Sequence, residues 1–429
     1  MQSSEALSER TLGTPREPSL ADVRDEEKGT DIHSDVPDGG WTAWMTTAGS
    51  YVGAFGVYQD YYTRTFMTNQ SASAISWIGS TQIGLVFMMG SISGKLLDMG
   101  YFHWCIGVGS ALHVFCLFML SLAHEQQYYQ VFLPQAIGLG IGQGLLFLPS
   151  IGVISHHFAK KRSLAMGIVF TGSSCGGMIF PIMLNNIIKR AGFAWGVRAT
   201  AFVVLACLVA ANLMMKTRLP PKTNQNPAHK SDFKGIMTHG VFLLTVFGTF
   251  LSMLGIWYPI FYIQLFAVRH NLDQNLSFYA LTILNAASIL GRTIPNFISD
   301  RIGVFNVMIP CTAIAGVLVF AMFGVKSSGA LVVFAILYGF FSGSFFSLMS
   351  PMIVALARHV HEVGVRLGFA FTFIGIATLI GTPISGALLT DDYLWYRPII
   401  FAGIAILTGA TCLTIARSMH VGHKGHACV

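Results

Sequence analysis

The sequence predicts an all-α membrane protein of twelve transmembrane helices, arranged as two pseudo-symmetric six-helix bundles. First, 53% of the 429 residues are hydrophobic, only 10% are charged and the mean hydropathy is +0.61, whereas soluble domains carry about 25% charged residues. Second, the apolar residues fall into runs long enough to cross a bilayer. Third, a pattern of small and polar residues recurs at a spacing of about 200 residues.

The apolar runs follow one another with short polar interruptions. Each has roughly the 17 to 25 residues that a helix needs to cross about 30 Å of hydrocarbon. Only helices and closed barrels satisfy every backbone polar group without water, and the short alternating segments of a barrel are missing from the sequence. We therefore expect helices at residues 41–61, 75–94, 104–123, 129–154, 164–188, 196–215, 238–262, 278–299, 306–325, 330–356, 367–389 and 397–416.

The segments between and around the bundles are polar. Residues 1–37 mix charges with Ser, Thr and Pro, which predicts a disordered cytoplasmic tail. No signal-peptide pattern precedes Trp41, so we expect no cleavable signal peptide. The expected bundles, 38–216 and 238–417, are joined by a cytoplasmic linker at 217–237, and residues 418–429 form a second tail. No metal site is predicted in any of these segments.

Basic residues are unequally distributed between the two sides of the membrane. They are more numerous in the tails and after the even-numbered helices, so the positive-inside rule places both termini in the cytosol. The net charge of +7 follows from this topology and gives no reason to expect a nucleic-acid partner. The sequons at Asn69 and Asn275 fall in expected outer loops, which makes both residues glycosylation candidates. The expected location is the plasma membrane.

The repeat relates the two bundles. Gly138 and Gly142 of the fourth run are matched by Gly339 and Gly343 of the tenth, and "GKLLD" at the end of the second run is matched by "FISDRIG" at the end of the eighth. Parallel six-helix repeats joined by a linker are the architecture of transporters whose halves rock about a site near the midplane. The repeat therefore predicts transport by alternating access.

Three longer strings carry a family resemblance. "PDGGW" (37–41), "HFAKKRSLAMGIVFTGSSCGG" (157–177) and "ILGRTIPNFISDRIG" (289–303) resemble the fungal branch of the monocarboxylate porter family within the major facilitator superfamily, over about residues 37–416. The resemblance implies the major facilitator fold.

The resemblance also implies conformational gating loops. "GKLLDMGYFH" resembles the superfamily's loop between helices 2 and 3, with Gly94 and Asp98 kept and Met99 where a basic residue is usual. We therefore expect weaker ion pairing at this copy. The second copy, with Asp300, Arg301 and Gly303, looks intact.

Arg292 interrupts the eighth run. At 1.5 Å per residue it lies roughly 12 Å inside the helix end, where translocon scales assign a cost of about 2.5 to 3.5 kcal/mol to a charged side chain. The resemblance implies that this arginine pairs with a substrate carboxylate, to which a guanidinium donates two parallel hydrogen bonds. The alternative is a structural arginine that contacts backbone carbonyls or reaches the inner surface.

Other candidate substrate contacts surround this position. Ser288 shares the helix face of Arg292, and Asn285 lies one further turn away. Tyr58 and Gln59, in the first run, could reach a central cavity, although tyrosines near a helix end are more often interfacial.

Proton coupling departs from the family pattern. The resemblance implies an aspartate where Ser288 stands and a lysine in the first run, which has none between Trp41 and Tyr62. Asp60 is the candidate replacement carrier. The alternative reading of Asp60 is an outer-interface carboxylate beside Arg64.

Three classes of function remain. The leading one is secondary active transport of a small monocarboxylate or related organic anion, coupled to protons by symport, which needs no cofactor and no enzymatic step. The alternative is efflux of a fungal secondary metabolite by the same fold. A membrane receptor or enzyme is disfavoured because the sequence has no nucleophile elbow, no HExxH and no paired intramembrane carboxylates. The tenth run carries four bulky side chains, which favour a small substrate: Phe340, Phe341, Phe345 and Phe346.

Overall fold

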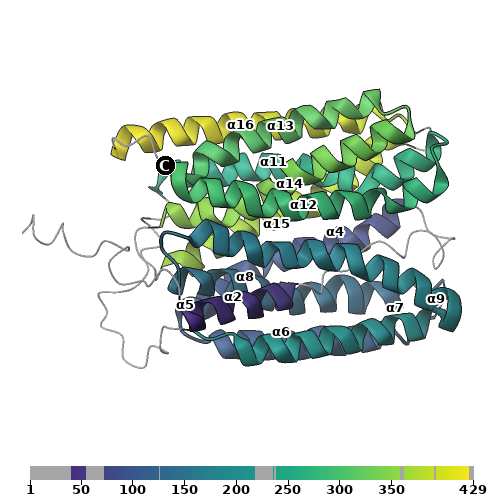
Figure 1. The fold of residues 1–429 in the computed structure, drawn as a ribbon, viewed down its shortest axis with the longest axis horizontal. Coiled ribbons are helices and arrows are strands. Elements are labelled where there is room, and N and C mark those ends of the chain that lie inside the picture. The colour runs from purple at the N-terminus through teal and green to yellow at the C-terminus, as the bar shows by residue number, and fades with distance from the viewer. Residues whose placement is uncertain are drawn as a thin grey trace, which may run out of the picture.

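The structure is a computed structural model that describes residues 40–54, 72–124, 126–217, 235, 238–357, 362–390 and 393–424. In this part of the chain the regular elements are all helical, and the long helices run side by side along one direction (Figure 1). The arrangement confirms the predicted all-α class.

The described residues of the first half form six spans. Two spans are built from several elements: α4 and α5 are separated at Met89, and the four elements from Tyr128 to His156 follow one another directly. α9 contains two spans that turn at Gly192, whose φ of 80° favours glycine. The elements are α2 (Trp41–Ala54), α4 (Ala72–Met88), α5 (Gly90–Asp98), α6 (Phe102–Leu120), α7 (Tyr128–Val131), η1 (Phe132–Leu139), α8 (Gly140–Gly152), η2 (Val153–His156) and α9 (Arg162–Met214).

The part of the second half that the structure describes also forms six spans, most of them single long helices. The last helix continues to Lys424, through residues that the sequence assigned to a tail. The elements are α11 (Gly240–Arg269), α12 (Gln274–Ile302), α13 (Val304–Ala321), η4 (Met322–Gly324), α14 (Ser328–Ala355), α15 (Val363–Leu389) and α16 (Tyr396–Lys424).

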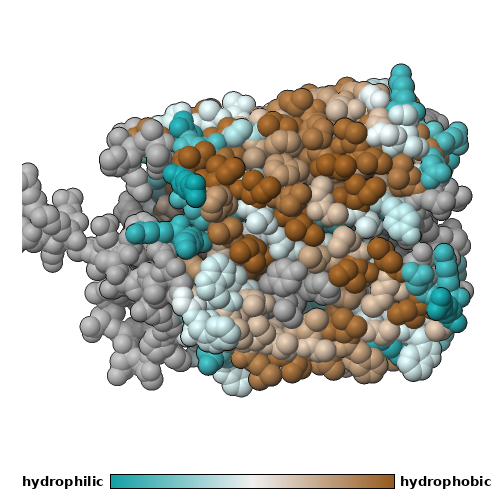
Figure 2. All heavy atoms as spheres, viewed as in Figure 1, coloured by the Kyte–Doolittle hydropathy of each residue, from teal (hydrophilic) through white to brown (hydrophobic). Residues whose placement is uncertain are grey.

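The surface of the described part fits a bilayer. On the face shown in Figure 2, hydrophobic side chains cover the middle and hydrophilic ones gather toward the two ends. Nine helical segments of the described residues are long and apolar enough to cross a membrane. The remaining spans are α2, which is described only to Ala54, the divided α4 and α5, and α12, which carries Arg292. The protein is therefore a multi-pass membrane protein.

The two halves meet along two pairs of helices. α4 and α5 pack against α15, and α9 packs against α12. Small residues bring the backbones into contact: a Cβ on Gly94 would overlap the carbonyl oxygen of Gly364, and a Cβ on Gly167 would overlap that of Arg292. Such close approach is typical of helix pairs in membranes, where small side chains allow extensive van der Waals contact.

Candidate functional site

A stripe of polar side chains on α12 faces the first half. Asn285, Ser288, Arg292 and Asn296 are spaced by three or four residues, which places them on one side of the helix. This side packs against α9 and α14, and Ser288, Arg292 and Asn296 are buried. The spacing predicted that Ser288 shares the face of Arg292, but the contacts of these side chains come from the pairing of α9 with α12.

Arg292 connects the two halves. Its Nη1 donates hydrogen bonds to the carbonyl oxygen of Phe170 and to Oγ of Ser173, both on α9. Its Nε is buried and has no acceptor among the described residues. The salt bridge found in the described part of the chain joins Arg366 to Glu362 and leaves Arg292 without a carboxylate partner there. One nitrogen thus makes the backbone contact of a structural arginine, while Nε still needs an acceptor.

The neighbours of Arg292 on α12 also contact α9. We call this contact between α9 and α12 the seam. Ser288 Oγ lies 2.9 Å from Oγ of Ser174, so a hydroxyl pair joins α12 to α9. Asn285 donates from Nδ2 to the carbonyl oxygen of Leu281 at 3.0 Å and packs against Gly177. Ser288 and Asn285 therefore lie on the same side of α12 as Arg292, against α9.

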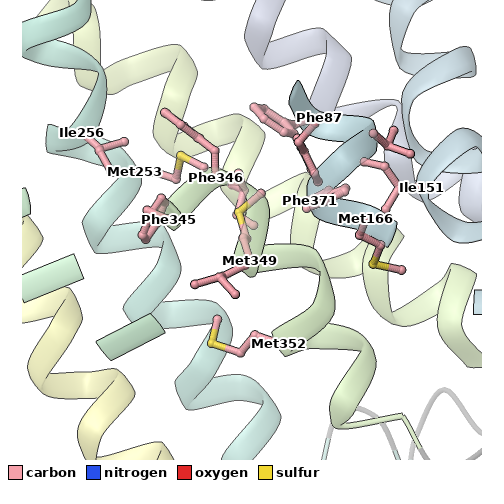
Figure 3. Packing of buried hydrophobic residues seen from close by; sticks show 14 of the residues in the cluster. Phe87, Ile151, Met166, Met253, Ile256, Phe345, Phe346, Met349, Met352 and Phe371 are labelled. Carbon is pink, nitrogen blue, oxygen red and sulfur yellow. The ribbon is translucent and has the colours of Figure 1, made fainter. Parts of the chain in front are cut away.

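Four phenylalanines from α4, α8, α9 and α15 pack together beside this seam. We call Phe87, Phe147, Phe170 and Phe371 the central cluster. Phe371, on α15, has its ring centre 5.5 Å from that of Phe87 and 5.7 Å from that of Phe147. Phe147 also contacts Phe170, at 5.8 Å. Figure 3 shows Phe371 next to Phe87, with the α14 residues Phe345 and Phe346 on the other side of the view.

At one end of the molecule, each half places a carboxylate at the start of a helix in the other half. Asp98 accepts hydrogen bonds from the backbone N–H groups of Gly364 (3.1 Å) and Val365 (2.8 Å) at the start of α15. In the same way, Asp300 accepts from the first turn of α9, at 2.9 Å from Ser163 N and 2.9 Å from Leu164 N. First-turn N–H groups lack intrahelical partners and carry partial positive charge. We call this region the capped end.

The contacts of Asp98 do not use a basic side chain. Met99 predicted weaker ion pairing at this copy, whereas the hydrogen bonds of both Asp98 and Asp300 come from backbone N–H groups of the other half. Arg301 lies over the ring of Phe297, with its Cζ 4.4 Å from the ring centre. Gly303 ends α12 with a φ of 96°.

Several sequence candidates cannot be placed at this site. Tyr58, Gln59, Asp60 and Asn69 lie outside the described residues, as do the tail 1–37 and most of the expected linker. Asn275 is in the first turn of α12, but its side chain lies outside the described part.

The sequence reasoning missed the acceptors on α9 and the central cluster. Ser173 and Phe170 lie within the string quoted for the family resemblance, but nothing local distinguishes them as partners of Arg292. Phenylalanine is common in apolar spans, so the central cluster gave no signal that single-sequence patterns could detect.

The fold and this seam define the class of protein. Two six-helix halves, joined by a buried polar and aromatic seam and capped across one end, form a secondary transporter. The Major Facilitator Superfamily model matches residues 41–323 and 279–424. The chain belongs to the Major Facilitator Superfamily.

Curated relatives from fungi cover most of the chain. The agnestins efflux protein AgnL12 of Paecilomyces divaricatus is 39% identical over 86% of this chain and 83% of its own length. The aspyridones efflux protein apdF of Emericella nidulans is 37% identical over 91% of this chain and 80% of its own. MFS-type transporter 1 of an Ophiocordyceps species is 38% identical over 90% and 87%. These names support the superfamily, but they do not support the monocarboxylate porter branch or the symport expected from the sequence.

Solved structures support the fold. A bacterial homologue of the iron transporter ferroportin, in an outward-facing state, superposes with a TM-score of 0.67 at 12% identity, covering 88% of this chain and 99% of the other. The transporter FucP, in an outward conformation, gives 0.60 at 14% identity, covering 88% and 97%. Both are members of the same architectural class.

Proposed function

We propose that this protein exports a small organic molecule of the kind called a fungal secondary metabolite. The observation that carries the proposal is the similarity to efflux proteins named for agnestins and aspyridones, at 39% and 37% identity over most of each chain. The efflux alternative therefore replaces transport of a small monocarboxylate as the leading function.

Arg292 supports an acidic group on the substrate. A buried donor without an acceptor costs about 1 to 3 kcal/mol, and more when it is charged. Lipid offers no acceptor in the hydrocarbon region. Nε of Arg292 is such a donor among the described residues. A carboxylate or another ionised oxygen on the substrate would supply the missing acceptor, with a charge-assisted hydrogen bond.

The capped end supports alternating access. Asp98 and Asp300 hold the two halves together there, and the backbones of Gly94 and Gly364 touch beside them. We propose that this end faces the cytosol, as the distribution of basic residues predicts. An exporter must open the capped end to load its substrate and close it before release on the opposite side.

Coupling to protons is part of the proposal. In the described part of the chain, the carboxylates all lie at helix ends: Asp98, Asp273, Asp300 and Glu362. None is placed near the middle of a span. We keep the candidate from the sequence, Asp60 near the end of the first run, as the proposed proton carrier. For an exporter, the coupling takes the form of proton exchange for substrate.

The test is transport into inside-out membrane vesicles that contain the protein. We expect accumulation of an acidic aromatic metabolite, dependent on a pH gradient and abolished by a protonophore, with little accumulation of labelled lactate. Vesicles from cells without the protein give the background. Accumulation of lactate without the metabolite would instead favour the small-monocarboxylate function.

A further inference from the structure

Two side chains that each carry a buried, unsatisfied N–H group lie near the ring of Phe346 on α14. Trp257, on α11, has its ring centre 4.8 Å from that of Phe346. Arg292, on α12, has its Cζ 6.0 Å from the same ring centre. In the described part of the chain, neither Nε1 of Trp257 nor Nε of Arg292 has a hydrogen-bond acceptor. Three helices of the second half thus bring two unsatisfied donors to one aromatic ring.

Both groups can only donate. An indole N–H and a guanidinium N–H have no acceptor function, and a buried tryptophan usually finds a partner for its N–H. Surrounding lipid cannot supply one. A bound molecule that satisfies both groups must therefore bring two acceptors.

The side chains around the two donors indicate which other chemical groups the bound molecule carries. Phe261 lies beside Trp257, with ring centres 5.9 Å apart, so Trp257 contacts the rings of both Phe261 and Phe346. Aromatic rings favour offset or edge contacts with another flat ring. The guanidinium adds positive charge, which requires an ionised group rather than a neutral one.

We propose that Trp257, Arg292 and Phe346 form a subsite for a planar aromatic anion that carries a second hydrogen-bond acceptor. The ionised group accepts from Arg292, the second acceptor accepts from Trp257, and the ring packs against Phe346. Nη1 of Arg292 keeps its contacts with α9, because the ligand uses Nε. The subsite rests on the proposed export function, for which it specifies the class of substrate.

The experiment is equilibrium binding to the purified full-length protein with three probes. Coumarin-3-carboxylate is planar and has an ionised carboxylate and a lactone carbonyl. 2-Naphthoate lacks the second acceptor, and coumarin lacks the charge. We expect coumarin-3-carboxylate to bind most tightly.

The decisive variant is Trp257→Phe, which keeps an aromatic ring and removes the N–H. It should weaken coumarin-3-carboxylate about fivefold, as expected for one hydrogen bond of roughly 1 kcal/mol, and leave 2-naphthoate unchanged. Trp395→Phe is the matched control, because Trp395 packs on Phe266 rather than on Phe346, and it should bind both probes like the unaltered protein.

Two outcomes would overturn the subsite. In the first, the unaltered protein binds all three probes with equal affinity, or binds none of them. In the second, Trp257→Phe lowers the affinity for coumarin-3-carboxylate and for 2-naphthoate equally, or lowers neither affinity. Failure of export is a separate result. If the protein binds the three probes with the expected order of affinity but does not export in vesicles, the proposed function is refuted and the subsite is retained.

Discussion

Replacing Asp98 by asparagine should open the capped end. Its carboxylate accepts two backbone N–H groups from the start of α15. Asparagine keeps one acceptor oxygen and turns an NH2 group toward the second donor. Hydrogen bonds to a charged group contribute about 1.5 to 3 kcal/mol, so losing one such contact shifts the equilibrium between closed and open roughly tenfold to one hundredfold.

The assay is labelling of a cysteine placed at the start of α9. Ser163 is buried beside Asp300, on the other helix pair of the capped end, so Ser163→Cys reports opening without touching Asp98. We expect Asp98→Asn to raise the rate of labelling by a membrane-impermeant thiol reagent, in vesicles that expose the capped end. The same protein without Ser163→Cys gives the background from native cysteines.

Asp273→Asn is the matched control. Asp273 also caps a helix, accepting from Leu276 N at 2.7 Å, but it does so within the second half and at the opposite end of α12. Its replacement should leave labelling of Ser163→Cys unchanged. Equal labelling in the Asp98→Asn variant and the unaltered protein would refute the reasoning that the carboxylate holds the halves together.

Four further changes test the contacts between the halves. Gly364→Ala adds a Cβ against Gly94, so it should increase thiol labelling at the capped end. Phe371→Ala leaves a cavity in the central cluster and should lower the unfolding temperature of the purified protein; in soluble proteins such a truncation costs about 3 to 5 kcal/mol. Ser173→Ala removes one acceptor of Arg292 and should also increase labelling, by the roughly two- to tenfold expected for one hydrogen bond. Ser174→Ala, which disrupts only the hydroxyl pair with Ser288, should have a smaller effect than Ser173→Ala because it leaves the contacts of Arg292 intact. Unchanged labelling in Gly364→Ala and Ser173→Ala, or an unchanged unfolding temperature in Phe371→Ala, would contradict these expectations.

The fold was predictable because the bilayer imposes strong rules on sequence. Long apolar runs must be helices, and the repeat of Gly138 and Gly142 as Gly339 and Gly343 indicated two related halves. Helix ends were less predictable. Met89 divides one expected span. The turn at Gly192 falls in the expected gap between residues 188 and 196, but helical structure continues closer to it on both sides than the sequence indicated.

The site was predictable only in part. A charged side chain in an apolar run is costly, so Arg292 stood out from its neighbours. Its contacts with Phe170 and Ser173 depend on which helices of the two halves pair, and sequence periodicity carries no information on that pairing. Trp257 was missed for a similar reason, because its significance comes from its distance to Phe346.

The most direct test of the account is the affinity of Arg292 variants for the exported acid. Arg292→Lys keeps the charge and loses the planar fork, and Arg292→Gln loses both. Truncating one partner of a desolvated charge pair costs about 2 to 5 kcal/mol, which raises the half-saturation concentration roughly 30-fold or more. We expect this increase in vesicle transport by Arg292→Gln, and a smaller one by Arg292→Lys, at equal amounts of protein in the membrane. Unaltered half-saturation in well-expressed Arg292→Gln would show that Arg292 has a structural role and does not bind the substrate.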